Sequence, residues 1–533
     1  MPYSHFSTEQ VVPLILSGLF LIVSIISFKK QATLSLVFLF LGSLGLGYFI
    51  ASLDNFLILW DEQYHALVAK NLSKDFLKPT LYSQPLLDYD YKCWPLNHIW
   101  LHKQPLFLWQ MALSIKLFGD TEFAVRLPSI IMHAIIPLFI YRIGKISINK
   151  ESGFYGAVFF ALAYFPLELV AGRYSTDHND IAFLFYVTAS FWAWFEYTAS
   201  QNKVWLLVIG LCSGFAVLVK WLMGLLIFVI WSCTKFVSDL GSGFKFKSYL
   251  PMLKSGVVSL FVFLPWQVYI HFKFPKEAAY EMELNARHFF EPVEDHGESI
   301  WYYFTSGFRT IYGSGDLIPF IFLFAVILMV LNIQKKEHKL FVSFGIAFVY
   351  LFYTLAQTKM VSFPVIVAPL IYLGLGFFTD KVLSLINSKI RSVIAQQSIS
   401  ISLVVGIAFT ALNLTKIQNS HTDWKSHDNH FRKDEQIEMN FINSLDKKLA
   451  DSNYVIFNAS ITHNGNIPIM FYTDYIAYSF IPSQSQIETI RKKGKKIAIL
   501  NLGFIPDYIT KDEEIILLEV ENKEQLTVTP DLN

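Results

Sequence analysis

The chain has 533 residues, of which 53% are hydrophobic and 17% are aromatic, while Asp, Glu, Lys and Arg together make up only 16%. A disordered chain would need low hydrophobicity and high net charge, and soluble domains carry roughly 25% charged residues. The 43 basic and 42 acidic residues nearly cancel, which argues against a basic face for nucleic acid. Three cysteines are too few for a disulfide-built scaffold. The composition therefore indicates an integral membrane protein.

Apolar runs recur along residues 1–414 and predict membrane-spanning helices. A helix needs ~20 mostly apolar residues to cross a bilayer, because its backbone polar groups must be satisfied within the segment. We expect about twelve such helices, and the pair around Lys220 is the least strongly marked. The predicted spans are 10–28, 33–53, 124–143, 153–170, 180–198, 204–219, 222–236, 251–271, 317–333, 340–356, 361–378 and 397–414.

Lys and Arg are concentrated in alternate loops between these spans. Because short cytoplasmic loops carry an excess of basic residues, this pattern predicts which loops face the cytoplasm. The basic loops contain Lys29, Lys30, Arg142, Lys145, Lys150, Lys203, Lys235, Lys245, Lys247, Lys335, Lys336, Lys339, Lys381, Lys389 and Arg391. The N-terminus and the turn at Lys220 are expected on the outer face of the membrane. The other outward loops are 54–123, 171–179, 272–316 and 357–360.

The composition changes at about residue 415, where the chain becomes polar. We expect a membrane domain at 1–414 and a small extracytoplasmic α/β domain at 415–533. In the second domain, segments with helical periodicity alternate with short buried runs. Helices are expected at 433–450 and 484–493, and strands are expected at 454–458, 475–480 and 496–500.

Ionisable residues are scarce within the predicted spans, where they include Glu168, Glu196 and His133. A proton- or ion-coupled transporter usually needs such residues at membrane depth. The unusual polar residues lie in the outward loops instead. This distribution favours chemistry at the outer membrane surface over transport through the bilayer.

The outward loop 54–123 carries two informative motifs. Asp61 and Glu62 are adjacent carboxylates just beyond a span, where low-dielectric surroundings can raise a pKa to suit a general base. An acidic cap of a surface helix is the alternative. Lys103 lies in an aromatic and apolar stretch that is typical of a helix in the interface plane, where it would hold a lipid phosphate or extend to water.

Further motifs follow along the outward segments. They are His102-Lys103-Gln104-Pro105-Leu106, Gly119 through Arg126-Leu127-Pro128-Ser129, Arg173 to Asp177, Gly214 to Lys220, Arg287 and His296 before Trp301-Tyr302-Tyr303, and Thr358-Lys359 before Pro364 and Pro369. Together with Asp61 and Glu62, this series resembles the GT-C polytopic glycosyltransferases of the aminoarabinose-transferase and dolichyl-phosphate-mannose-protein mannosyltransferase type, glycosyltransferase families 39 and 83. The sequence departs from that pattern at Gln104, Trp221 and Phe363, where relatives often have Pro, Gly and Tyr.

The resemblance implies a GT-C fold and an enzyme that transfers a sugar, with inversion, from polyprenyl (undecaprenyl) phosphate to an extracytoplasmic acceptor such as lipid A. It implies that Asp61 is the general base, that Glu62 supports it, and that Asp177 is a second acidic catalytic residue. The cations expected at the donor phosphate are Lys103, Lys220, Arg287 and Lys359.

The resemblance also raises a metal site, because some relatives bind a divalent metal at the position of His102. By ligand type, Asp177 with either His288 or His296 would complete such a site. The sequence requires no other cofactor. The expected partners are a polyprenyl-phosphate sugar, a lipid, protein or glycan acceptor, and membrane lipids, but not nucleic acid.

The acceptor stays open at this level. A protein O-mannosyltransferase-like enzyme and a surface-polysaccharide glycosyltransferase are alternatives, and the difference should lie in 272–316 and the C-terminal domain. From another class, a lipid-linked-sugar flippase would also handle such a donor, although the scarcity of charge within the spans opposes it. The family features favour a bacterial inner-membrane protein, with the catalytic loops and the C-terminal domain facing the periplasm.

Overall fold

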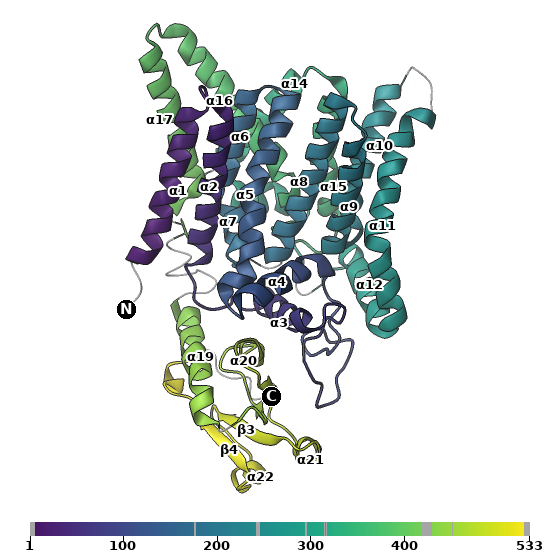
Figure 1. Ribbon diagram of the computed structural model, residues 1–533, viewed down its shortest axis with the longest axis vertical. Coiled ribbons are helices and arrows are strands. Elements are labelled where there is room, and N and C mark those ends of the chain that lie inside the picture. Colours follow the sequence, from purple (N-terminus) through teal and green to yellow (C-terminus); the bar gives the residue numbers. More distant parts are fainter. Residues whose placement is uncertain are drawn as a thin grey trace.

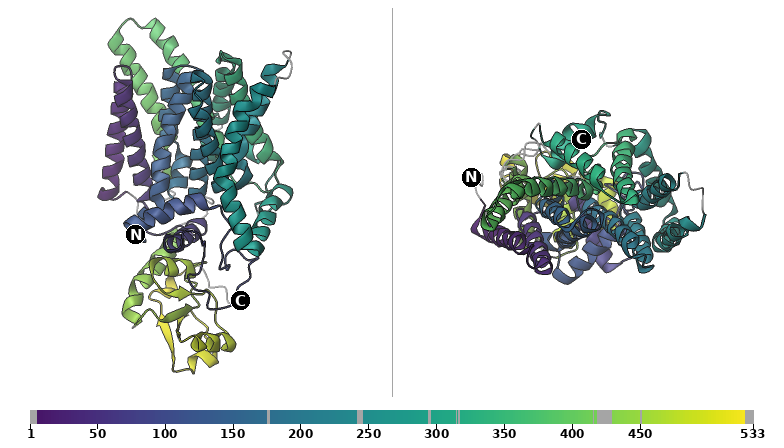
Figure 2. Two further views of the ribbon diagram at one scale, coloured as in Figure 1. Left: turned by 45° about the vertical axis from the view of Figure 1, so that its right-hand side comes forward. Right: turned by 90° about the horizontal axis from the view of Figure 1, so that it is seen from above.

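The structure, a computed structural model, describes residues 6–174, 177–240, 246–293, 296–313, 315, 317–414, 416–417, 429–449 and 451–526. Long helices stand side by side in an upright bundle, and a small α/β domain lies against one end of it (Figure 1). Figure 2 shows the same two layers from a second side. The membrane bundle and the polar C-terminal domain are therefore stacked along the long axis of the molecule.

The bundle is formed by helices that run between its two ends. They are α1 (Thr8–Ser27), α2 (Ala32–Ala51), α5 (Glu122–Ser147), α6 (Lys150–Ala161), α7 (Tyr164–Val170), α8 (Asp177–Ser200), α9 (Val204–Lys220), α10 (Leu226–Asp239), α11 (Leu250–Lys273), α14 (Ile318–Asn332), α15 (Lys336–Leu355), α16 (Ala368–Lys389) and α17 (Val393–Leu412). Each predicted span coincides with one of these helices, and the span predicted at 153–170 is the bent pair α6 and α7.

Within the described residues, eight helices are long and apolar enough to cross a membrane, or up to nine if the bent pair counts as one span. This criterion joins 204–239 into one run, and α14 has only 15 residues. The prediction of a polytopic α-helical membrane protein is confirmed. The number of helices that meet this criterion of length and composition is below the expected number of about twelve spans.

A tight turn separates α9 from α10. Trp221 has a φ of 51°, and it begins a short 3₁₀ helix that runs from Trp221 to Leu225. The Ser213 hydroxyl donates a hydrogen bond of 2.8 Å to the Gly224 carbonyl. A Cβ at Gly224 would lie 2.2 Å from the backbone nitrogen of Val217, so only glycine fits there. The chain therefore folds back on α9 and leaves Lys220 at the turn.

Shorter helices cover the end of the bundle that faces the C-terminal domain (Figure 1). They are α3 (Asp61–Lys74), α4 (Pro105–Phe118) and α12 (Pro275–Phe290). The first two belong to the predicted outward loop 54–123 and the third to the loop 272–316. The two loops that were expected to carry the chemistry thus meet at one end of the bundle.

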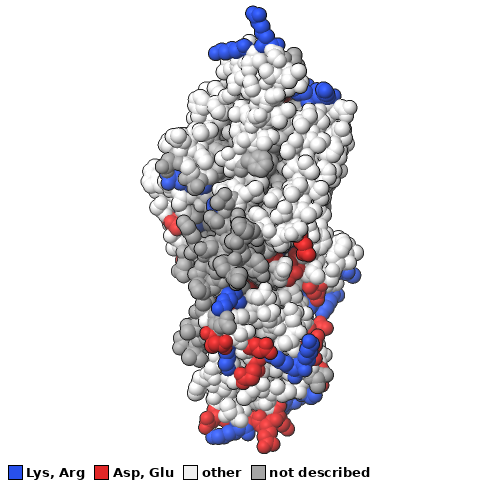
Figure 3. All heavy atoms as spheres, turned by 90° about the vertical axis from the view of Figure 1, so that its left-hand side faces the viewer, with Lys and Arg blue, Asp and Glu red and all other residues white. Residues whose placement is uncertain are grey.

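The charges divide the surface into zones. On the face drawn in Figure 3, few charged side chains are seen along the middle of the bundle. Lys and Arg gather at the top of the view, and both signs mix at the bottom, where the C-terminal domain lies. An uncharged belt between two charged ends is the surface that a bilayer requires. Which end faces the periplasm stays a prediction.

The C-terminal domain is built around a four-stranded parallel sheet in the order β2-β1-β3-β4. The expected small α/β domain is therefore present, with one strand more than the sequence predicted. The strands are β1 (Tyr454–Phe457), β2 (Ile476–Ala477), β3 (Lys496–Asn501) and β4 (Ile515–Glu519), and the helices are α19 (Asn429–Lys448), α20 (Asn466–Tyr472), α21 (Gln484–Lys492) and α22 (Asp507–Thr510).

Buried polar contacts attach this domain to the bundle. Helix α20 packs on α3, and the ammonium group of Lys70 donates to the carbonyls of Met470, Phe471 and Thr473 at 3.3, 2.7 and 2.9 Å. The Tyr472 hydroxyl donates to the Glu122 carboxylate at 2.6 Å. Lys70 is 5% exposed, so these contacts form in surroundings where polar groups need partners. They hold α20 against the C-terminal half of α3 and the start of α5.

Candidate active site

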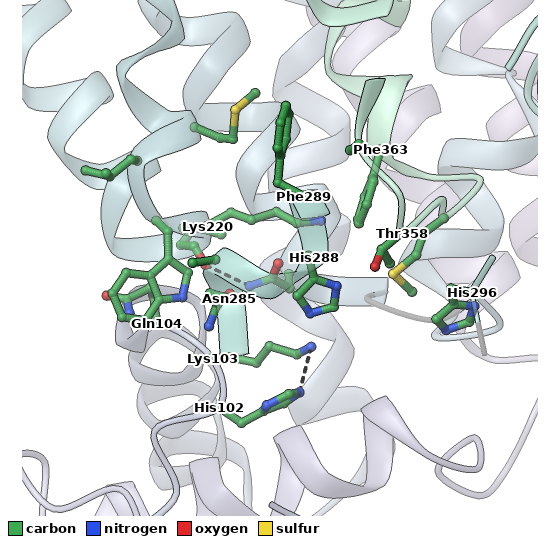
Figure 4. A pocket seen from close by; sticks show the side chains of 18 of the residues that line it. His102, Lys103, Gln104, Lys220, Asn285, His288, Phe289, His296, Thr358 and Phe363 are labelled. Carbon is green, nitrogen blue, oxygen red and sulfur yellow. Dashed lines mark hydrogen bonds between the residues drawn. The ribbon is translucent and has the colours of Figure 1, made fainter. Parts of the chain in front are cut away.

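A cavity of about 960 Å³ opens where the first outward loop, the turn after α9, and α12 meet. Figure 4 shows its side chains, which come from segments far apart in the sequence and point toward a shared space. The polar and charged residues that line it include Asp61, His102, Lys103, Gln104, Asn179, Lys220, Asn285, His288, His296 and Thr358. Its remaining wall is largely aromatic and aliphatic. This combination suits a ligand with a charged head and an apolar tail.

Asp61 is the carboxylate that faces the cavity. It is the first residue of α3, and its side chain is 16% exposed. Its Oδ1 atom lies 3.9 Å from the Lys103 ammonium group and 3.9 Å from Nε2 of His65, one helical turn later. The N-terminal end of a helix also favours negative charge. Asp61 is therefore held as an accessible carboxylate beside a cation.

Glu62 is turned away from the cavity into the protein. Arg126 donates to its two carboxylate oxygens at 2.7 and 2.9 Å, the Ile58 backbone N–H donates at 2.6 Å, and His178 Nε2 lies 3.1 Å away. Burial by itself raises the pKa of Glu62, but the charge and hydrogen bonds of Arg126 and His178 outweigh it and lower the pKa to about 2. Glu62 is therefore a charged carboxylate at neutral pH, and it binds Arg126, His178 and the backbone at Ile58.

Arg126 uses all five of its N–H groups. Beyond Glu62, it donates to the carbonyls of Ala51 and Asp54 at 2.7 and 2.8 Å and of Phe56 at 2.7 Å. The guanidinium therefore ties the end of α2 to the start of α3. The sequence analysis quoted Arg126 within a motif but assigned it no role, because nothing in the sequence names the carbonyls that it binds.

Asp177 lies beneath the cavity rather than in its wall. It is fully buried, and its Oδ1 atom is 3.1 Å from Nδ1 of His65. The His65 ring packs edge-on against Trp100 and Phe107, at centroid distances of 5.9 and 4.9 Å. Asp177 can therefore act on Asp61 only through His65. The sequence analysis missed His65, although its i+4 spacing from Asp61 places both on one face of α3.

Two of the expected phosphate-binding cations line the cavity. Lys103 lies 3.3 Å from Nε2 of His102, next to Asp61. Lys220 pairs with Asp180 and lies 4.7 Å from the centroid of the Phe363 ring. Both side chains are partly exposed, at 18% and 20%, and both line the cavity, where an anion could pair with them.

The other two cations do not line the cavity. Lys359 turns its ammonium group back to the carbonyls of Thr354, at 3.0 Å, and Ala356, and so caps the end of α15. Burial lowers the pKa of Lys359. Arg287 is exposed on α12 and pairs with Glu291. In place of Lys359, its neighbour Thr358 lines the wall.

The three expected metal ligands are not brought together. His102 bonds Glu281 at 3.3 Å and stacks on the Trp94 ring, whereas Asp177 bonds His65. His296 lines the cavity, and its carbonyl accepts from the Lys359 backbone N–H at 2.9 Å. In the described parts of the chain, no three His, Cys, Asp or Glu side chains are grouped to hold a metal ion. A metal centre formed by His102, Asp177 and His296 stays a prediction.

Similarity in sequence covers part of the chain. Residues 102–269 match the dolichyl-phosphate-mannose-protein mannosyltransferase family. An undecaprenyl phosphate-α-4-amino-4-deoxy-L-arabinose arabinosyl transferase of Pseudomonas paraeruginosa is 27% identical over 174 residues, which are 31% of this chain and 29% of that protein. An uncharacterized protein of Aquifex aeolicus is 25% identical over 165 residues, 30% of this chain and 29% of that protein. These alignments span less than a third of either relative.

Similarity in structure covers most of the chain. ArnT from Cupriavidus metallidurans, solved bound to undecaprenyl phosphate, superposes with a TM-score of 0.60 and 12% identity over 86% of this chain and 88% of that one. The oligosaccharyltransferase AglB from Archaeoglobus fulgidus was solved with an inhibitory peptide and a dolichol-phosphate. It superposes with a TM-score of 0.54 and 11% identity over 88% of this chain and 69% of that one.

The chain has the GT-C fold.

Within this GT-C fold, the cavity lies at the end of the bundle where α3, α4 and α12 lie. The resemblance seen in the sequence identified the fold and named Asp61, Lys103 and Lys220, which the structure brings to one wall. It did not reveal His65, whose Nε2 atom lies 3.9 Å from Oδ1 of Asp61, or Arg126, which binds the adjacent Glu62.

Proposed function

We propose that this chain is an inverting membrane glycosyltransferase that takes a sugar from a polyprenyl phosphate and transfers it to an acceptor hydroxyl. One observation carries the proposal: the carboxylate of Asp61 and the ammonium groups of Lys103 and Lys220 line a single cavity of about 960 Å³ in a GT-C fold. A base and two cations are the groups that displacement of a sugar phosphate requires. The superposition on ArnT, which was solved with undecaprenyl phosphate, supports the class of donor.

In this proposal Asp61 accepts the proton of the acceptor hydroxyl. The hydroxyl oxygen then forms a bond to the anomeric carbon, while the bond from that carbon to the phosphate oxygen breaks on the opposite face, which inverts the configuration. The leaving phosphate gains negative charge, and Lys103 and Lys220 stabilise it. Glu62 and Arg126 keep the start of α3 in place throughout.

The wall of the cavity also suits the lipid part of the donor. Apolar side chains from α12, α15 and the turn after α9 line it, and they include Leu222, Met223, Met282, Phe289 and Phe352. A prenyl chain gains free energy when such surfaces are removed from water. The donor would thus place its phosphate at the two lysines and its chain toward the bilayer.

The proposed site faces the periplasm of a bacterial inner membrane. Nucleotide sugars are cytosolic, so an enzyme on the outer face needs a sugar carried by a lipid. The orientation is tested with a variant in which the three native cysteines are replaced and one new cysteine is introduced by Ser485→Cys, at an exposed position of α21. An impermeant thiol reagent should label it in intact spheroplasts. If the reagent labels this cysteine only after the cells are lysed, the C-terminal domain faces the cytoplasm and the proposed orientation is wrong.

The function is tested with purified protein in detergent and a panel of undecaprenyl-phosphate sugars. Transfer to lipid A, to Ser- and Thr-containing peptides or to surface polysaccharide is measured together with the release of undecaprenyl phosphate. Lys103→Ala should raise the KM for the donor about tenfold or more, because a charge-assisted contact to phosphate is lost. Lys92→Ala, in the same outward loop but outside the cavity wall, is the matched control. Absence of transfer from every donor, or a loss confined to the acceptor, would contradict the proposal.

A further inference from the structure

Trp60, the residue before Asp61, presents an indole ring at the mouth of the cavity. It lines the cavity and is 40% exposed, which is unusual for so large an aromatic side chain beside a buried core. Its backbone has a φ of 74° and a ψ of −117°, a region that residues other than glycine rarely adopt. Such strain persists where the surroundings impose it, and it is concentrated at functional sites.

The surroundings that impose this conformation are the contacts of Arg126 and Glu62. Arg126 binds the Phe56 carbonyl at 2.7 Å, and Glu62 accepts from the Ile58 backbone N–H at 2.6 Å. The chain is therefore fixed on both sides of a short loop, which leaves Trp60 directed outward next to the carboxylate of Asp61.

A second aromatic ring meets Trp60 from the C-terminal domain. The exposed ring of His463 lies with its centroid 5.0 Å from that of Trp60, at an interplanar angle of 53°. His463 belongs to the loop after β1. In the sheet order β2-β1-β3-β4, the chain passes from β1 to β2 at one edge of the sheet and from β3 to β4 at the opposite edge. The direction of winding therefore changes between β1 and β3, and ligands of open parallel sheets bind at such a switch point.

Polar contacts hold this loop in place. The Thr462 hydroxyl donates to Glu438 at 2.9 Å, and the Tyr64 hydroxyl donates to the side-chain oxygen of Asn464 at 3.3 Å. His463 itself remains at the surface between these two anchored residues. The loop thus presents one ring toward Trp60 while its neighbours are fixed.

The exposed pair is not what attaches the two domains. Attachment is provided by the buried contacts of Lys70 with the carbonyls of α20 and by the bond from Tyr472 to Glu122. A pair of rings that served only as an adhesive contact would be expected in the buried part of that interface. Trp60 and His463 instead lie at its edge, open to solvent and next to the base.

We propose that Trp60 and His463 form the acceptor subsite, and that it binds a saccharide ring. A sugar ring has an apolar face of C–H bonds, which packs on an aromatic ring, and a rim of hydroxyls, one of which would then point at Asp61. The acceptor is accordingly a glycan or the glycan part of a glycolipid, rather than a polypeptide. This inference rests on the proposed function, because it assigns the substrate class of the same site.

The test is direct binding of the full chain in detergent to an array of lipopolysaccharide core oligosaccharides, surface polysaccharides and Ser- and Thr-containing peptides. The wild type should bind glycans. Trp60→Ala should weaken that binding about tenfold, and Trp60→Phe should retain most of it. Trp301→Ala removes an exposed Trp outside the cavity wall and should have no effect.

The outcomes separate this inference from the proposed function. Glycan binding is measured without a sugar donor, so it does not depend on turnover. Glycan binding that depends on Trp60 in a protein without transferase activity would support the subsite and contradict only the function. If Trp60→Ala does not fold, His463→Ala decides, because His463 is exposed in a loop. Glycan binding that neither variant weakens, or binding of peptides alone, would overturn the inference.

Discussion

Arg126 and Glu62 form a buried ion pair in which Nε and Nη2 of the guanidinium donate to the two carboxylate oxygens at 2.7 and 2.9 Å. The two residues are 1% and 0% exposed at their side chains. Glycine at 172, with a φ of 77°, makes room for the pair, because a Cβ there would lie 2.5 Å from the Glu62 carboxyl carbon. The pair fixes the start of α3, where the neighbouring Asp61 lines the cavity beside Lys103.

Arg126→Lys should therefore destabilise the protein strongly. A lysine cannot supply the planar set of five donors, and the breaking of a buried pair costs about 3–5 kcal/mol. The free energy of unfolding in detergent measures the loss. Arg142→Lys is the matched control, because Arg142 makes the same two-pronged contact with Glu196 but is 39% exposed. It should lose about 1 kcal/mol or less. An equal loss in both variants would contradict the role of Arg126.

The same pair predicts a pH dependence of stability. The pKa of Glu62 is lowered from 4.5 to about 2, so its carboxylate stabilises the folded state fully above pH 4.5. That contribution should be lost as the pH falls from 4.5 toward 2. Thermal unfolding of the wild type and of Glu62→Gln, measured across this range, should show their difference shrinking at acid pH. A difference that stays constant would show that Glu62 is not charged in the folded protein.

His65 should act as a positioning residue for Asp61. Its ring lies between Asp61 and Asp177, at 3.9 and 3.1 Å. His65→Gln keeps a hydrogen-bond donor for Asp177, but the glutamine has no ring nitrogen near Asp61 and positions it less well. The kcat should therefore fall about ten- to a hundredfold, while the KM for the sugar donor stays unchanged. His271→Gln, on the exposed end of α11, is the control. A rise in KM with normal kcat would place His65 at the donor instead.

The two lysines Lys220 and Lys359 should behave differently when they are replaced by methionine. Lys220 lines the cavity, so Lys220→Met should raise the KM for the donor about tenfold. Lys359 binds carbonyls at the end of α15, so Lys359→Met should lower the melting temperature and leave the KM within about twofold. Steady-state kinetics and thermal unfolding check both. The reverse pattern would restore Lys359 as the phosphate ligand.

The sequence predicted the helices well because each span must bury its apolar side chains and satisfy its own backbone. Apolar runs at 10–28 and 33–53 predicted α1 and α2 closely. Asp61 and Lys103 could be named because the motifs that contain them resemble those of a known family. In the C-terminal domain, β4 at Ile515–Glu519 was missed, because its short run lies in a strongly charged segment.

The directions of the side chains could not be predicted. Lys359 belongs to a motif of the resemblance, yet its ammonium group turns to carbonyls at the end of the preceding helix, α15. Arg287 likewise finds Glu291 one turn away and stays at the surface. Arg126 and His65 were passed over because their partners are 64 and 112 residues distant along the chain. Tertiary contacts decide which charges reach the cavity.

The central claim is that Asp61 is the general base of a sugar transfer from polyprenyl phosphate. The most direct measurement is the turnover of purified Asp61→Asn with an undecaprenyl-phosphate sugar that the wild type uses, beside Asp88→Asn as an exposed aspartate of the same loop. We expect Asp61→Asn to fold normally and to lose at least ~100-fold in kcat, while Asp88→Asn remains active. Turnover of Asp61→Asn close to that of the wild type would contradict the account.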